Sequence, residues 1–138
     1  MEYTHSEGPW AETAVRLVVR KPDLDADFVS RAIPLPPTSV RHPGSDHRNP
    51  PTSEDGLWVL QVHDRMPGGI SDQLRTLLET LEPHSSALTR LADQGYDVHV
   101  ALSGFVGRGA TFVLPPELVR RAAALGVPVT VTTSVSDR

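Results

Sequence analysis

Short stretches of alternating apolar and polar residues run through the chain, and this is the pattern of strands that bury one face. In the first stretch Val15, Leu17 and Val19 share one parity, whereas Arg16 and Arg20 share the other. Two later stretches are separated by a turn with three glycines, which favours a hairpin because glycine tolerates positive φ. The valines of the last stretch are expected to point inward. We predict strands over residues 12–21, 57–63, 96–103, 110–114 and 127–134.

Between these strands, apolar residues recur at spacings of three and four, as in amphipathic helices. The leucines of residues 74–81 show this spacing most clearly, and Gly95 is expected to end their helix in the left-handed conformation. Asp23 or Asp25 is expected to cap a preceding short helix, and Ser71 to cap the long one. A last helix is predicted to begin at Pro115 and Pro116 and to end at Gly126.

This order of elements predicts an α+β fold, a two-layer sandwich with the helices on one face of a mixed sheet. From residue 57 onward the order matches a ferredoxin-like βαββαβ arrangement, and an extra βα unit precedes it. Right-handed crossovers place the long and last helices on the same side, which leaves the other face of the sheet bare. This bare face is expected to carry Arg16, Val18, Arg20, Val59, Gln61, His63, Asp97, His99, Thr111, Val113, Thr130 and Thr132.

The chain is expected to form one domain. Residues 1–11 contain several polar groups and show no regular spacing of apolar residues, so they are predicted to be a flexible leader. Residues 12–138 are predicted to make up the domain. Residues 35–56 hold five prolines and almost no large apolar residue, which predicts a long Pro-rich loop. A loop of this length is either a site for a partner or a segment that wraps and protects a sheet edge.

Composition narrows the class of protein. A chain of 138 residues is long enough to fold without disulfides or a metal, and it has no cysteine. Its start lacks a secretory signal, and no apolar run approaches the roughly 18 residues of a membrane-spanning helix. We therefore expect a cytoplasmic protein that does not act on membranes. Its net charge of -4 and its few clustered basic residues argue against a nucleic-acid partner.

Several sequence elements occur in an order that is shared with a known family. They are the Pro37 and Thr38 pair, the segment LWVL, the ladder ending LEPHSSALTRLADQG and the terminal LPPELVRRAAALGVPVTV. Over residues 12–133 the chain resembles the bacterial family called domain of unknown function 4279, although its loop reads VRHPGSDHRNPP and departs from the family pattern. The resemblance implies the fold and brings no catalytic residues. Some small α+β proteins of this kind look like immunity partners of toxins, which is analogy.

The long loop holds five candidate binding residues, which are Arg41, His42, Asp46, His47 and Arg48. Two imidazoles and a carboxylate among them are the nearest approach to a set of metal ligands in the chain. A metal site needs ligands that further hydrogen bonds hold rigidly, and a loop of proline and glycine does not provide this by itself. We therefore predict a partner-binding role for these residues, and neither a metal nor another cofactor.

Three further candidates, His63, Asp97 and His99, belong to the predicted bare face. Asp97 and His99 lie two residues apart on one strand, so their side chains point the same way and could form an acid–base pair, as could His63 with His99. Ser103 has the same parity, but six residues of strand separate it from Asp97 by roughly 20 Å, which excludes a Ser-His-Asp triad on this strand. No catalytic residue is predicted.

The long loop and the bare face are available for recognition, and the sequence shows no set of catalytic residues. This combination favours a non-enzymatic binding module. It would engage a protein partner, or a second copy of itself, through the long loop or the bare face. The alternative is a small-molecule-binding protein or enzyme with its site between the bare face and the loop. A third possibility is a structural homodimer that buries Val18, Val59 and Val113.

Overall fold

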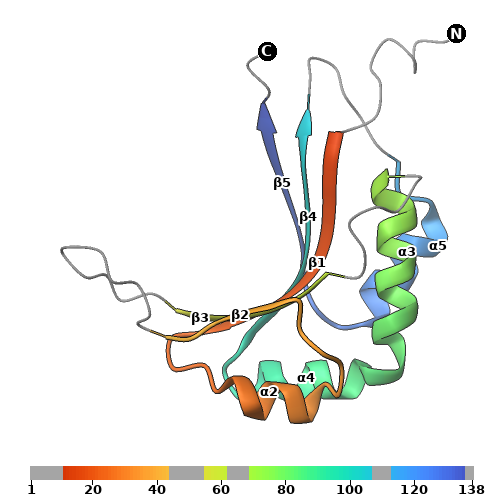
Figure 1. Cartoon of the computed structure of the whole chain (residues 1–138). Coiled ribbons are helices and arrows are strands. Elements are labelled where there is room, and N and C mark those ends of the chain that lie inside the picture. The colour runs from red at the N-terminus through yellow and green to blue at the C-terminus, as the bar shows by residue number, and fades with distance from the viewer. Residues whose placement is uncertain (1–10, 44–54, 62–68, 107–112, 136–138) are drawn as a thin grey trace, which may run out of the picture.

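The computed structural model describes residues 11–43, 55–61, 69–106 and 113–135. A five-stranded sheet and a layer of helices confirm the predicted α+β class (Figure 1). The predicted leader lies outside the described residues except for Ala11. The strands are β1 (Ala11–Lys21), β2 (Ser39–Arg41), β3 (Gly56–Gln61), β4 (Asp97–Val106) and β5 (Val129–Val135). The helices are α2 (Ala26–Ala32), α3 (Gly69–Leu81), α4 (Ser85–Asp93) and α5 (Pro116–Ala124), with the 3₁₀ turn η1 (Glu82–His84) between α3 and α4.

β1 lies at the centre of the sheet, whose strand order is β2-β3-β1-β4-β5. It pairs antiparallel with β3 and with β4, so Val18 lies opposite Val59 on one side and opposite His99 on the other. β2 joins β3 antiparallel, and β5 joins β4 in parallel. The mixed sheet is confirmed, but the ferredoxin-like arrangement is not. The strand that was predicted to belong to an extra unit separates β3 from β4, and the α3–α4 segment crosses over it.

The structure does not form the predicted hairpin of residues 96–114 in the part of this segment that it describes. Gly104 does not begin a turn, because β4 continues through it to Val106 and pairs with β5 along this length. Val113 and Leu114 are not in a strand, and the Val113 carbonyl accepts a hydrogen bond from Ser71 Oγ of α3 at 2.6 Å. Val113 therefore lies beside the helices and not on the bare face. Residues 107–112, with the predicted Thr111, lie outside the described residues.

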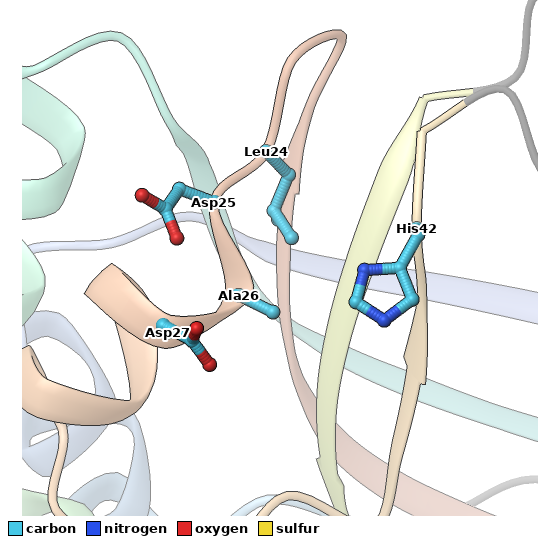
Figure 2. Close-up of a pocket in the computed structure, with 5 residues that line it drawn as sticks. All are labelled: Leu24, Asp25, Ala26, Asp27 and His42. Atoms are coloured by element: carbon cyan, nitrogen blue, oxygen red, sulfur yellow. The ribbon is translucent and has the colours of Figure 1, made fainter.

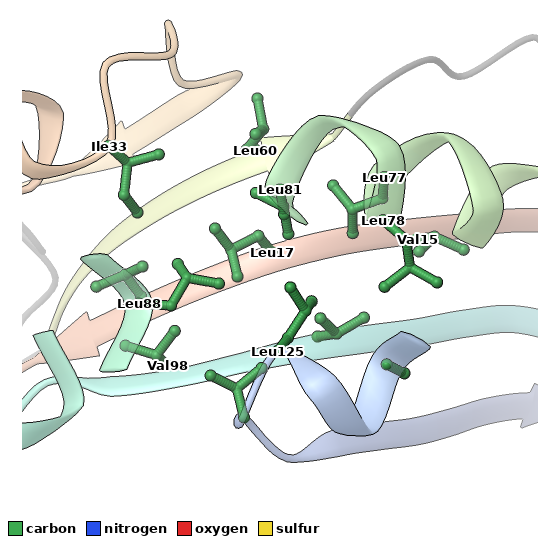
Figure 3. Packing of buried hydrophobic residues seen from close by; sticks show 14 of the residues in the cluster. Val15, Leu17, Ile33, Leu60, Leu77, Leu78, Leu81, Leu88, Val98 and Leu125 are labelled. Carbon is green, nitrogen blue, oxygen red and sulfur yellow. The ribbon is translucent and has the colours of Figure 1, made fainter. Parts of the chain in front are cut away.

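One cluster of apolar side chains joins the sheet to the helices (Figure 3). β1 contributes Val15, Leu17 and Val19, which have the parity predicted to point inward. All four leucines of the predicted ladder in α3 are buried, because helical spacing brings them to the same side. Trp58 enters the cluster from β3, and its Nε1 donates to Ser30 Oγ of α2 at 3.0 Å. The short helix is thus anchored to the sheet by a buried aromatic ring with a satisfied polar group.

Local signals set the helix ends largely as predicted. The Asp25 side chain caps α2 and accepts a hydrogen bond from a first-turn amide at 3.1 Å. Gly95 follows α4 with a φ of 92°, in the left-handed region. Ser71 is not a cap, because α3 begins at Gly69 and includes it. Pro83 lies in η1, so the predicted long helix is divided into α3 and α4.

β5 is an edge strand, and the helices cover it incompletely. Its valines have the predicted parity, because Val129 and Val131 lie opposite Val100 and Leu102 of the core. They are not fully covered, since Val129 is 39% exposed and Val131 is 52% exposed. In the described structure a neighbouring strand covers β5 on one side only, which leaves apolar side chains accessible along this edge.

The division between the two sheet faces can be tested at neighbouring positions of β1. Leu17 is fully buried, so Leu17→Ala is expected to lower the free energy of unfolding by about 3 kcal/mol through lost burial and a residual cavity. Val18→Ala is the matched control on the bare face, where we expect a loss of about 1 kcal/mol or less. Urea unfolding followed by circular dichroism measures both values. Equal losses would contradict the assignment of the faces.

A second prediction concerns the ion pair that ties η1 to α5. Arg121 Nε and Nη2 donate to the two carboxylate oxygens of Glu82 at 2.7 and 3.2 Å. The hydrogen bond from Arg121 lowers the pKa of the Glu82 carboxyl below its ordinary 4.5. The folded-state pKa is thus lower than the unfolded one, so the stabilisation is complete above the ordinary pKa and is lost as pH falls through the folded-state pKa.

We therefore expect Glu82→Gln to remove a small step from the acid limb of the stability–pH curve. The step is small because the pair is partly exposed and solvent screens it. Asp93→Asn, at an exposed position at the end of α4, is the control and should keep the step. Urea midpoints between pH 3 and 7 provide the measurement. An unchanged acid limb in the Glu82 variant would show that this ion pair is not linked to folding.

Candidate recognition surface

In the described structure the helices lie on one side of the sheet and leave the other side bare, as predicted (Figure 1). The sheet bends, and the bare face lies on the inner side of the bend. Pairing between the strands arranges its side chains in rows that cross the sheet. The first row is Arg41, Leu57, Arg20 and Asp97; the second is Ser39, Val59, Val18 and His99; the third is Gln61, Arg16, Ala101 and Thr130.

The first row contains a connected set of charged groups, together with the neighbouring His99. Arg20 Nη2 donates to Asp97 Oδ2 at 2.9 Å, and Arg20 Nε lies 3.7 Å from Asp55 Oδ2. The other carboxylate oxygen of Asp97 lies 3.2 Å from His99 Nδ1. The His99 side chain is only 17% exposed, and it lies opposite Val18 of β1, one row from Arg20 and Asp97. The predicted contact between Asp97 and His99 is thus present, with Arg20 as a third member.

Arg41 lies at the same end of the bare face and closes the base of the long loop. Its Nε and Nη2 donate to the Asp55 backbone carbonyl at 3.1 and 2.8 Å. The side chain of Asp55 is the one that faces Arg20. The structure therefore brings Arg41 of the loop cluster into one row with Asp97 of the sheet. Sequence reasoning missed Arg20 and Asp55 as site residues, because the register of the strands was needed to place them.

His42 points the other way, as expected for the next residue of an extended segment. Figure 2 shows His42 across a surface hollow from the beginning of α2, on the helix side of the sheet. The hollow is lined by Leu24, Asp25, Ala26, Asp27 and His42. Asp25 is already engaged as the cap of α2, and no three His, Cys, Asp or Glu side chains group as metal ligands within the described ranges. The structure thus separates His42 from Arg41, its neighbour in the predicted cluster.

The remaining candidates, Asp46, His47, Arg48 and His63, lie outside the described residues. Their roles stay predictions, and so does the pairing of His63 with His99. Of the helices in the described ranges, none is long and apolar enough to cross a membrane.

Apolar side chains occupy the middle of the bare face. Val18 and Val59 lie opposite each other in the second row, and Ala101 follows on β4; all three are partly exposed. We call these three residues the apolar centre. In the third row, Arg16 Nε donates to Gln61 Oε1 at 3.2 Å across the β1–β3 pair. Val18 and Val59 thus lie between the charged row and the Arg16–Gln61 pair, and Ala101 lies beside Arg16 in the third row.

A family model described as domain of unknown function (DUF4279) matches residues 11–136, which is nearly the whole chain. The chain belongs to this family. The resemblance noted from the sequence is therefore confirmed. No curated protein and no solved structure matched the chain. The DUF4279 match runs from β1 to β5, so every strand of the bare face lies within the family domain.

Proposed function

We propose that this DUF4279 protein is a protein-binding module that uses the bare face as its recognition surface. The apolar centre carries the proposal, because Val18, Val59 and Ala101 are partly exposed in the middle of a sheet face that no described helix covers. Specific protein interfaces combine an apolar core, depleted of charge, with a polar rim. The apolar centre has this anatomy, with the charged row on one side of Val18 and Val59 and the Arg16–Gln61 pair on the other.

The charges around the apolar centre also support a protein partner. Arg20 is balanced by Asp97 and Asp55, and Arg16 is bonded to Gln61. Among the described residues the rim holds Arg16, Arg20 and Arg41 against Asp55 and Asp97, an excess of one positive charge, whereas a nucleic-acid surface presents several Lys or Arg side chains to phosphates. Side chains that are already held in place lose less conformational entropy when a partner binds. The rim is therefore suited to a partner of balanced charge.

The proposal predicts the effect of a charge placed in the apolar centre. Val59→Lys should abolish partner capture, because a partner would have to bury the new ammonium group without a counter-charge. Val113→Lys is the matched control, since Val113 is 72% exposed and lies beside the helices. Quantitative mass spectrometry of pull-downs from the native lysate compares both variants with the wild type. A partner that Val59→Lys retains would exclude the bare face as its binding surface.

A second candidate function is the binding of a small molecule at the charged end of the bare face. The 3.2 Å separation of Asp97 Oδ1 and His99 Nδ1 favours it, because a carboxylate beside an imidazole can orient the ring toward a ligand. The partial burial of His99 would shield such a contact from water.

The small-molecule candidate is tested by analysis of the metabolites that elute with the protein. His99→Ala should lose an enriched metabolite, since the imidazole would no longer contact it. His84→Ala is the control, because His84 lies in η1 among the helices. Both variants are compared with the wild type by mass spectrometry of the small-molecule eluate. A metabolite that His99→Ala retains would remove this residue from the site.

A further inference from the structure

β5 forms one edge of the sheet, and among the described residues it pairs only with β4. Its seven residues are valine, threonine and serine, without a charge or a proline. Edge strands are usually short, or are protected by charged side chains, prolines or bulges, because an open ladder pairs with other strands. The opposite edge is shorter and charged, since β2 has three residues and includes Arg41. A proline flanks each edge strand, Pro43 after β2 and Pro128 before β5, so among the described residues the two edges differ in length and charge.

The outward hydrogen-bonding groups of β5 belong to alternate residues. Val100 N donates to the Pro128 carbonyl at 2.9 Å, which directs this carbonyl toward β4. The backbone groups of successive residues in a strand point to opposite sides, so the even-numbered residues of β5 continue the ladder with β4. The N–H and C=O groups of Val129, Val131 and Thr133 therefore point away from β4.

The same edge carries accessible apolar side chains on its helix side. Val129 and Val131 are both exposed there, and Val129 also lines a groove between α3, α5 and β5 with Leu74 and Leu118. The groove has a volume of about 240 Å³. Its lining is aliphatic, so the groove can receive aliphatic side chains of a neighbouring protein strand.

We propose that β5 pairs in antiparallel fashion with β5 of a second copy of the chain, about a two-fold axis at Val131. In this register the outward backbone groups of Val131 meet those of Val131 in the second copy. Val129 lies opposite Thr133, and Thr130 lies opposite Thr132. The two valines at the axis cover each other on the helix side, and pairs of β-branched side chains stabilise antiparallel strands. One sheet then continues through both copies.

A second copy suits this edge because a two-fold interface requires a surface that is complementary to itself. The described side chains of β5 carry no charge, so a copy of the strand does not repel it. From residue 129 to residue 133, every pair in the proposed register joins valine or threonine to valine or threonine. The interface leaves the bare face free in both copies, so it is independent of the proposed partner surface.

The test is sedimentation velocity over a range of protein concentrations, with two variants at the axis. Val131→Pro removes the outward N–H, and an edge strand tolerates proline where this group faces solvent. Val131→Lys places two like charges opposite each other across the axis. Each change enters the interface twice, so we expect the dissociation constant of the dimer to rise at least about tenfold in both variants. Val113→Lys removes another exposed valine and should dimerise like the wild type.

Circular dichroism and thermal unfolding of dilute samples confirm that the variant monomers are folded. A wild-type chain that stays monomeric at the highest soluble concentration would overturn the proposal. So would a dimer that persists in both Val131 variants, or one that Val113→Lys weakens to the same extent. If Val59→Lys alone disrupts the dimer, the copies meet through the bare face and not through β5. If β5 binds only the strand of a different protein, no dimer of the purified chain will be seen.

Discussion

The pairing of β1 with both β3 and β4 is the constraint on which the rest of the structure depends. A central strand has its backbone groups satisfied on both sides, and alternation then directs its side chains to two different environments. Leu17 enters the core, while Val18 and Arg20 lie on the bare face. Because β1 is antiparallel to both neighbours, β3 and β4 run parallel, and the α3–α4 segment must cross over β1 to connect them.

The same pairing assembles the candidate recognition surface from distant parts of the chain. Arg20 and Asp97 are separated by 77 positions, yet they lie opposite each other and form an ion pair. Asp97 in turn orients His99, and Asp55 connects Arg20 to the base of the long loop. These side chains are therefore engaged in contacts with one another beside the apolar centre.

Among the described residues, the two edge strands of the sheet, β2 and β5, differ in length and charge. β2 is short, and Arg41 bonds to the base of the loop that follows it. β5 is longer, uncharged and apolar on its helix side, where Val129 borders a groove against α5. Sheet edges of the second kind expose both unpaired backbone groups and apolar side chains to water. A second β5 strand would cover both at once, without using the bare face.

The sequence by itself determined most of the elements and the inward parity of β1, because alternation, helical spacing and caps such as Asp25 act over a few residues. It missed β2, which lies within the predicted long loop. It also predicted most of the bare face, including Val18, Asp97 and His99. Only the tertiary structure decided the strand order, which rests on backbone pairing between segments whose local patterns are compatible with several partners. It therefore also decided that Arg41 joins the charged row while His42 turns to the opposite side of the sheet.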